Sequence, residues 1–141
     1  MEDTKLTNRW EPIDFTVYFK FTWLIALMAI IVEIIFRINA DRLGSGMLFE
    51  QKEVFSWIIR SVFFVLIGWR VFKVFGGGVM IAVVSGAIAG LLIGLVISLF
   101  RFFGGFEVWK LFNVFTETLS AIVIGTAFSM LSSFIIIKTK K

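Results

Sequence analysis

Apolar positions along the chain gather into four long runs that are separated by short polar or glycine-rich segments. A helix rises about 1.5 Å per residue, so about 20 residues are needed to cross a bilayer core about 30 Å thick. Each run is at least this long. The pattern predicts four membrane-spanning helices, at residues 15–38, 53–75, 78–100 and 109–137.

Three short separators, residues 39–52, 76–78 and 101–108, join the runs, and all three contain glycines that favour turns. Links this short make neighbouring helices antiparallel. The predicted fold class is an all-α integral membrane protein, an antiparallel bundle of four transmembrane helices with both termini on one side.

Polar segments flank the four runs. Residues 1–14 mix both charge signs and lack an apolar core, so we interpret them as a polar N-terminal segment and not as a cleaved signal peptide. Residues 138–141, KTKK, form a basic tail. A single transmembrane domain, residues 15–137, is expected between them, with no second globular unit.

The composition agrees with a protein that is solvated by lipid. Hydrophobic residues make up 59% of the chain and charged residues 17%, below the roughly 25% charged residues of soluble domains. The mean hydropathy is +0.96. Four buried helices of a soluble protein would not fit this sequence, because nothing in it would shield so much apolar surface from water.

The basic residues predict the orientation. The side with both termini and the second separator carries eight Lys and Arg residues, and the opposite side carries five, namely Arg37, Arg42, Lys52, Arg101 and Lys110. By the positive-inside rule, both termini are expected in the cytoplasm. We expect the protein in the cytoplasmic membrane of a bacterium or an archaeon.

Small residues recur at every fourth position of the last two runs. The third run has Ala82, Gly86, Gly90, Gly94 and Ser98, and the fourth has Ala121, Gly125, Ser129 and Ser133. In lipid, such stripes allow helix backbones to approach closely. They predict tight packing of these two helices through the four glycines. Alternatively, one stripe serves self-association or the docking of another subunit.

Charged residues inside the predicted spans need an explanation, because each costs about 2.5 kcal/mol or more at the centre of a bilayer. Counted from Lys20, Glu33 lies roughly 20 Å into the membrane, and Arg60 lies about 15–20 Å from the same side. These depths predict a pair between Glu33 and Arg60. Arg37, at about 26 Å, and Glu117, near the opposite surface at about 31 Å from the basic tail, are predicted to form a second pair.

Two interpretations of these charges remain open. In the first they are structural pairs that fix which helices are neighbours, with Asn113 and other polar residues of the fourth run beside them. In the second they form a polar path in which Glu33 binds a cation or a proton and Arg60 modulates its affinity for that proton.

The chain contains no Cys and no His. This absence excludes disulfides and thiolate metal sites, and it removes the usual haem, zinc and copper ligands. It also leaves serines without their ordinary general base. We therefore expect no enzyme activity, no cofactor and no metal. The basic tail fits lipid headgroups, and nothing more specific points to nucleic acid.

The segment WLIALMAIIVEII, residues 23–35, places Glu33 in the first of four short spans. Over this one helix the chain resembles the small multidrug resistance transporters. The later runs lack the aromatic and glycine pattern of those transporters, so the chain is not assigned to that family.

Three classes of function are compatible with the sequence. The favoured class is an accessory or oligomer-forming subunit of a membrane complex, whose partners are the lipid bilayer and either copies of itself or other membrane subunits. An alternative is a compact oligomeric ion channel or ion-coupled transporter that uses Glu33 and Arg60. A holin-like protein that permeabilises membranes is a third, suggested by small size and the basic tail.

Overall fold

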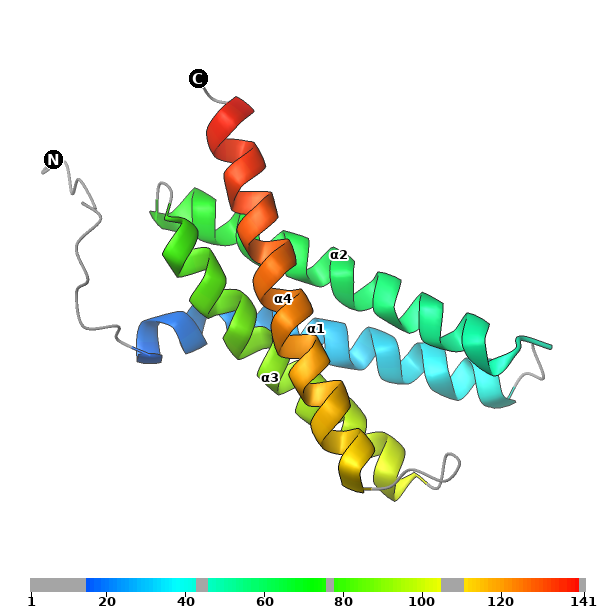
Figure 1. Ribbon diagram of the computed structural model, residues 1–141. Helices are drawn as coiled ribbons and strands as arrows, with labels where there is room; N and C mark the ends of the chain where they lie inside the picture. Colours follow the sequence, from blue (N-terminus) through cyan, green and yellow to red (C-terminus); the bar gives the residue numbers. More distant parts are fainter. Residues whose placement is uncertain (1–14, 43–45, 76–77, 105–110, 140–141) are drawn as a thin grey trace, which may run out of the picture.

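Four helices account for nearly all of the described chain. The computed structural model describes residues 15–42, 46–75, 78–104 and 111–139, so the predicted N-terminal segment and the end of the basic tail lie outside it. The helices are α1 (Phe15–Arg42), α2 (Phe49–Phe75), α3 (Val79–Phe103) and α4 (Leu111–Thr139) (Figure 1). All four are long and apolar enough to cross a membrane, which confirms the all-helical prediction.

The first three helices are longer than the predicted spans, and α4 has the predicted length but lies two residues further along the chain. Residues 39–42 belong to α1 and residues 49–52 to α2, so the first separator is much shorter than predicted. α3 likewise continues through Arg101 to Phe103, and Gly104 ends it by donating its backbone N–H to the Phe100 carbonyl at 2.9 Å. Apolar content marks where a helix would enter lipid, whereas the backbone continues through polar residues that are compatible with a helix.

The helices form two crossed hairpins. In Figure 1, α1 and α2 lie together as one antiparallel pair, α3 and α4 form the other, and α4 crosses over the first pair. The contact between α3 and α4 is the most extensive, and α2 also packs against both of these helices. α1 packs against α2 and α3, but within the described residues it has no direct packing contact with α4.

Many of the buried side chains are small or polar, whereas many of the exposed side chains are large and apolar. Alanines such as Ala29, Ala89 and Ala121 are fully buried, and Phe64 is the one aromatic side chain among the buried core residues of the described chain. Large apolar side chains are exposed along every helix. Examples are Met28, Ile58, Leu95 and Leu119. A soluble protein seldom exposes such continuous apolar surface, so the helices indicate a membrane protein.

The glycines of α3 lie directly against the backbone of α4. A Cβ atom at Gly90 would lie 2.7 Å from the Ile122 Cα, and one at Gly94 would lie 2.8 Å from the Ala121 Cβ. Gly86 and Gly125 face each other so closely that a Cβ on Gly125 would come within 2.6 Å of the Gly86 carbonyl oxygen. Any side chain larger than hydrogen would force α3 and α4 apart.

α4 also packs closely against α2, at Gly68 of α2, which is not part of either small-residue stripe. A Cβ atom at Gly68 would lie 2.5 Å from the Ser129 carbonyl oxygen. This closeness lets the Ser129 hydroxyl donate to the Phe64 carbonyl, and the Ser132 hydroxyl to the Val65 carbonyl, each at 3.0 Å. Such hydrogen bonds between helices are typical of packing in lipid.

Candidate functional site

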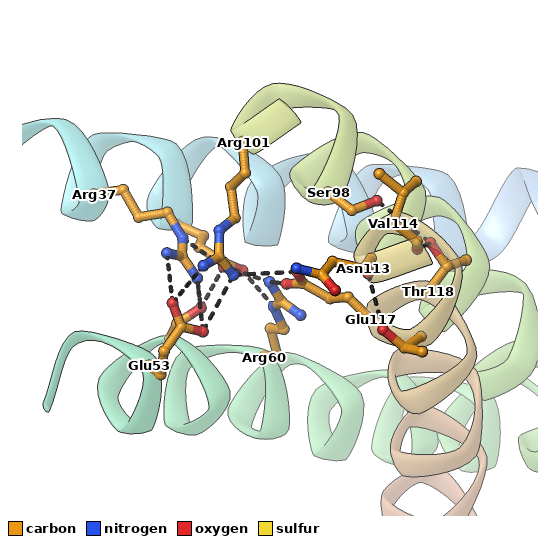
Figure 2. Close-up of polar contacts among 12 residues, drawn as sticks. Arg37, Glu53, Arg60, Ser98, Arg101, Asn113, Val114, Glu117 and Thr118 are labelled. Atoms are coloured by element: carbon orange, nitrogen blue, oxygen red, sulfur yellow. Dashed lines mark hydrogen bonds and ion pairs between the residues drawn. The ribbon is translucent and has the colours of Figure 1, made fainter. Parts of the chain in front are cut away.

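All four helices contribute charged side chains to one cluster near the end of the bundle where α1 and α3 finish and α2 and α4 begin. Figure 2 shows the side chains of Arg37, Glu53, Arg60, Arg101 and Glu117 converging there. With Glu33 they comprise three arginines and three glutamates. Their formal charges therefore sum to zero.

Glu33 and Arg60 form a fully buried pair with two parallel hydrogen bonds. The Arg60 Nε atom donates to Glu33 Oε2 and the Arg60 Nη2 atom to Glu33 Oε1, both at 2.7 Å. Both residues are 0% exposed. The two parallel bonds match the planar fork of a guanidinium to a carboxylate, which is a strong, charge-assisted geometry. The structure thus brings together the two residues that helix rise places at one depth.

Arg37 pairs with Glu33, four residues before it on the same helix, and with Glu53, but not with Glu117. Its Nε donates to Glu33 at 3.1 Å and its Nη1 to Glu53 at 3.1 Å. Its Nη2 donates to the Ser56 hydroxyl at 2.8 Å, and Ser56 in turn donates to Glu33. The predicted pair between Arg37 and Glu117 is wrong, because α1 does not pack against α4.

Glu117 is bound from two other helices. It accepts a hydrogen bond from Arg60 Nη2 of α2, and its Oε2 accepts one from Arg101 Nη1 of α3 at 3.1 Å. Arg101 Nη2 also lies 2.8 Å from Glu53 Oε1. Arg101 therefore joins the carboxylates of α2 and α4.

These contacts close into a ring of alternating charge. Ion pairs connect the six residues in the order Glu33, Arg60, Glu117, Arg101, Glu53, Arg37 and back to Glu33. We call these six residues the ionic ring. Each carboxylate contacts two guanidinium groups and each guanidinium contacts two carboxylates, so no charge in the ring is left uncompensated.

Arg60 has one further contact. Its guanidinium carbon lies 4.6 Å from the centre of the Trp57 ring, a cation–π distance. Its Nη1 atom is buried and has no hydrogen-bond partner among the described residues. The remaining N–H groups of Arg60 are used by the carboxylates.

Two members of the ring were not among the predicted site residues. Arg101 was counted with the charges outside the spans, and Glu53 was the first residue of a span. Helix periodicity could have indicated both residues. Arg101 follows Ser98 by three residues, and Glu53 precedes Arg60 by seven. Each therefore lies on the same helix face as a buried residue.

An open pocket of about 250 Å³ lies beside the ring. Asn113 belongs to this pocket and not to the ring. Glu53, Arg101 and Glu117 of the ring reach the pocket, and the side chain of Glu53 is 24% exposed. The full lining is Phe49, Glu53 and Trp57 of α2, Arg101 of α3, and Asn113, Thr116, Glu117 and Ser120 of α4.

The described residues contain no group of three His, Cys, Asp or Glu side chains that could hold a metal ion. The carboxylates of the ring are instead neutralised by arginines. No protein-family model, curated protein or solved structure matches this chain.

Proposed function

We propose that this chain is an integral membrane protein that crosses the bilayer four times, with both termini in the cytoplasm. The lengths and apolar composition of the four helices support this proposal. The exposed apolar surface supports it too, because lipid is the solvent that such a surface prefers. The excess of Lys and Arg on the side of the termini supports the orientation.

Within this membrane protein, the ionic ring is structural. The observation that carries this conclusion is the closure of the ring through all four helices. An unpaired charge inside a bilayer is expensive, and separating α2, α3 or α4 from the bundle leaves at least one charge of the ring without its ion-pair partners. The ring therefore selects one arrangement of the bundle over others.

The proposed function is that of a non-catalytic subunit of a membrane complex, built from copies of this chain or from other membrane proteins. The buried charged side chains pair with one another within the ring. A partner protein would therefore bind to the lipid-facing surfaces of the helices. The exposed faces of α1 and α4 are especially suitable, since these helices do not cover each other.

Native mass spectrometry of the tagged protein, extracted in a mild neutral detergent, tests this function. We expect a homo-oligomer of defined size or a reproducible set of other membrane subunits. Recovery of the monomer alone, from several detergents that preserve the helical fold, would contradict the subunit proposal.

Transport is the second candidate, favoured by the pocket. The pocket makes Glu53 and Glu117 accessible from the surface of the bundle. Glu53 connects to the fully buried Glu33 through Arg37, and Glu117 connects to it through Arg60. Ion or proton flux into liposomes that contain only this chain is the test, with Glu33→Gln as the variant and Glu50→Gln, at the exposed start of α2, as the control.

The two candidates predict different outcomes. Flux that requires Glu33 but not Glu50, in a variant that still folds, would support transport and contradict a purely structural ring. No flux, together with loss of stability in Glu33→Gln, supports the structural ring. Leakage of large solutes regardless of either substitution would instead favour a holin-like protein.

A further inference from the structure

The helix halves that lie farther from the ionic ring carry positive charge and no negative charge. These halves are residues 15–28 of α1, 63–75 of α2, 79–90 of α3 and 126–139 of α4. They contain no Asp or Glu but four basic residues, namely Lys20, Arg70, Lys73 and Lys138. The described helices therefore supply no counter-charge at this end of the bundle.

Arg70 is the basic residue of this end that most needs a counter-charge. It is half-buried near the end of α2. Among the described residues it has no hydrogen-bond or ion-pair partner, whereas each arginine of the ionic ring contacts two carboxylates. A guanidinium group beside hydrocarbon is costly without an anion, so an anion from outside these helices would stabilise it.

Lys73 and Trp69 lie beside Arg70 on the surface of α2. Lys73 follows Arg70 by three residues and Trp69 by four, so it is a neighbour of both on the helix. The Lys73 Nζ atom lies 5.3 Å from the centre of the Trp69 ring, a cation–π distance. Both Lys73 and Trp69 are exposed. We call Trp69, Arg70 and Lys73 the basic patch.

The basic patch lies at the depth of phospholipid phosphates. α2 has 27 residues, or about 40 Å of helix, which exceeds a bilayer core by about 10 Å. With the core centred on α2, Lys73 lies just outside the core and Arg70 just inside it. A long arginine side chain can extend from there to the phosphate level.

An apolar surface continues from the basic patch toward the middle of α2. Leu66 and Val62 precede Lys73 by seven and eleven residues, which places them on the same helix face. Both are exposed, as is Trp69. The face thus changes from positive to apolar over a few turns, as the surface of a phospholipid changes from its phosphate to its acyl chains.

We propose that the basic patch binds an anionic phospholipid in the leaflet on the side of the termini. Arg70 donates N–H bonds to the phosphate oxygens, and Lys73 adds a second positive charge. The acyl chains lie along Trp69, Leu66 and Val62. An anionic headgroup fits better than a zwitterionic one, because the ammonium group of the latter would be repelled by the two basic side chains. The inference rests on the proposed membrane insertion and not on the subunit proposal.

Native mass spectrometry of the full chain tests this lipid site. The protein is reconstituted in nanodiscs with equal amounts of phosphatidylglycerol and phosphatidylethanolamine, released with a mild neutral detergent, and compared for the lipids that stay bound. We expect severalfold more phosphatidylglycerol than phosphatidylethanolamine on the unchanged protein. Titration of phosphatidylglycerol into the detergent-solubilised protein then gives its affinity.

The variants remove one positive charge at a time. Arg70→Gln and Lys73→Gln should each lower the affinity for phosphatidylglycerol about fivefold, whereas Arg70→Lys should retain most of it. Lys52→Gln, near the start of α2 and outside the ionic ring, changes the net charge equally at the other end of the helix and should have no effect. Circular dichroism checks that each variant keeps the helical content of the unchanged protein.

Equal retention of both lipids by the unchanged protein would overturn the inference. It is also the result expected if the acidic residues of the N-terminal segment, residues 1–14, neutralise the basic patch. Equal affinities of Arg70→Gln and Lys52→Gln for phosphatidylglycerol would overturn it as well. Failure of the protein to enter nanodiscs would contradict membrane insertion itself, so the two failures are distinguishable.

Discussion

Arg60 is held from three directions at once. Its guanidinium donates two parallel hydrogen bonds to Glu33, a further one to Glu117, and stacks on the ring of Trp57. A lysine would preserve the charge, but its single ammonium group lacks the planar fork that matches a carboxylate. The residue type at position 60 is therefore as important as its charge.

Removing one member of the Glu33–Arg60 pair should destabilise the protein strongly. Each single variant, Glu33→Gln or Arg60→Gln, leaves a buried charge without its main partner, which costs about 3–5 kcal/mol. The double variant should lose less than the sum of the two single losses, because it leaves no isolated partner. The free energy of unfolding in mixed detergent micelles measures this, and Glu50→Gln at the exposed start of α2 should change little. Strictly additive losses would show that the two side chains do not interact.

Exchanging the two charges distinguishes a ring from an isolated pair. In the combined variant Glu33→Arg/Arg60→Glu, the new guanidinium would face Arg37 and the new carboxylate would face Glu117. We expect the exchanged protein to be no more stable than the single Glu33→Gln variant, as judged by the same unfolding measurement. Recovery close to the stability of the unchanged protein would mean that the contacts of Arg37 and Glu117 with this pair contribute little.

The central pair was predictable and the closure of the ring was not. Helix rise alone places Glu33 and Arg60 at one depth, because both lie well inside apolar runs. Arg101 and Glu53 lie at the ends of such runs, where a charge is equally compatible with water. Their role depends on how far α2 and α3 extend as helices, and hydropathy does not determine that.

At the scale of helices, close approach of α4 to both α2 and α3 organises the bundle. The α3–α4 contact was predictable because its small residues repeat every four positions. The contact of Gly68 with Ser129 was not, since Gly68 stands alone among large side chains in the segment VLIGWR. A single glycine gives no periodic signal, and its partner is known only from the three-dimensional arrangement.

A methyl group at Gly90 should separate α3 from α4. The Gly90→Ala substitution places a Cβ atom against the Ala121 carbonyl oxygen and 2.7 Å from the Ile122 Cα, both of which belong to the backbone. Overpacking of this kind costs about 1–3 kcal/mol. The midpoint of thermal unfolding in detergent should fall accordingly. Gly104→Ala is the matched control, because Gly104 is exposed and has right-handed helical angles; an equal fall in both variants would contradict the tight contact.

At the scale of the whole molecule, the polar residues are gathered inside and the apolar residues outside. The number and type of the helices followed from apolar runs and glycine-rich links. The choice of α3 over α4 as the second neighbour of α1 did not, because an antiparallel order is compatible with either helix in that place. The choice of α3 explains why Arg37 pairs with Glu53 and leaves Glu117 to Arg60 and Arg101.

The chain has no native cysteine, so a single introduced cysteine reports on one position only. Leu48 is exposed just before α2, Leu111 is exposed at the first residue of α4, and Lys73 is exposed near the end of α2. Ile58 and Val123 are exposed within the proposed spans. In the proposed topology, these five positions lie on both sides of the membrane and in its interior.

Labelling of the five cysteine variants in intact cells with a membrane-impermeant maleimide tests the central claim that the molecule crosses the bilayer with its apolar surface in lipid. We predict that Leu48→Cys and Leu111→Cys react from outside, that Lys73→Cys reacts only after the cells are opened, and that Ile58→Cys and Val123→Cys stay unreactive until detergent is added. Reaction of Leu48→Cys and Lys73→Cys from the same side, or ready reaction of Ile58→Cys in intact membranes, would contradict it.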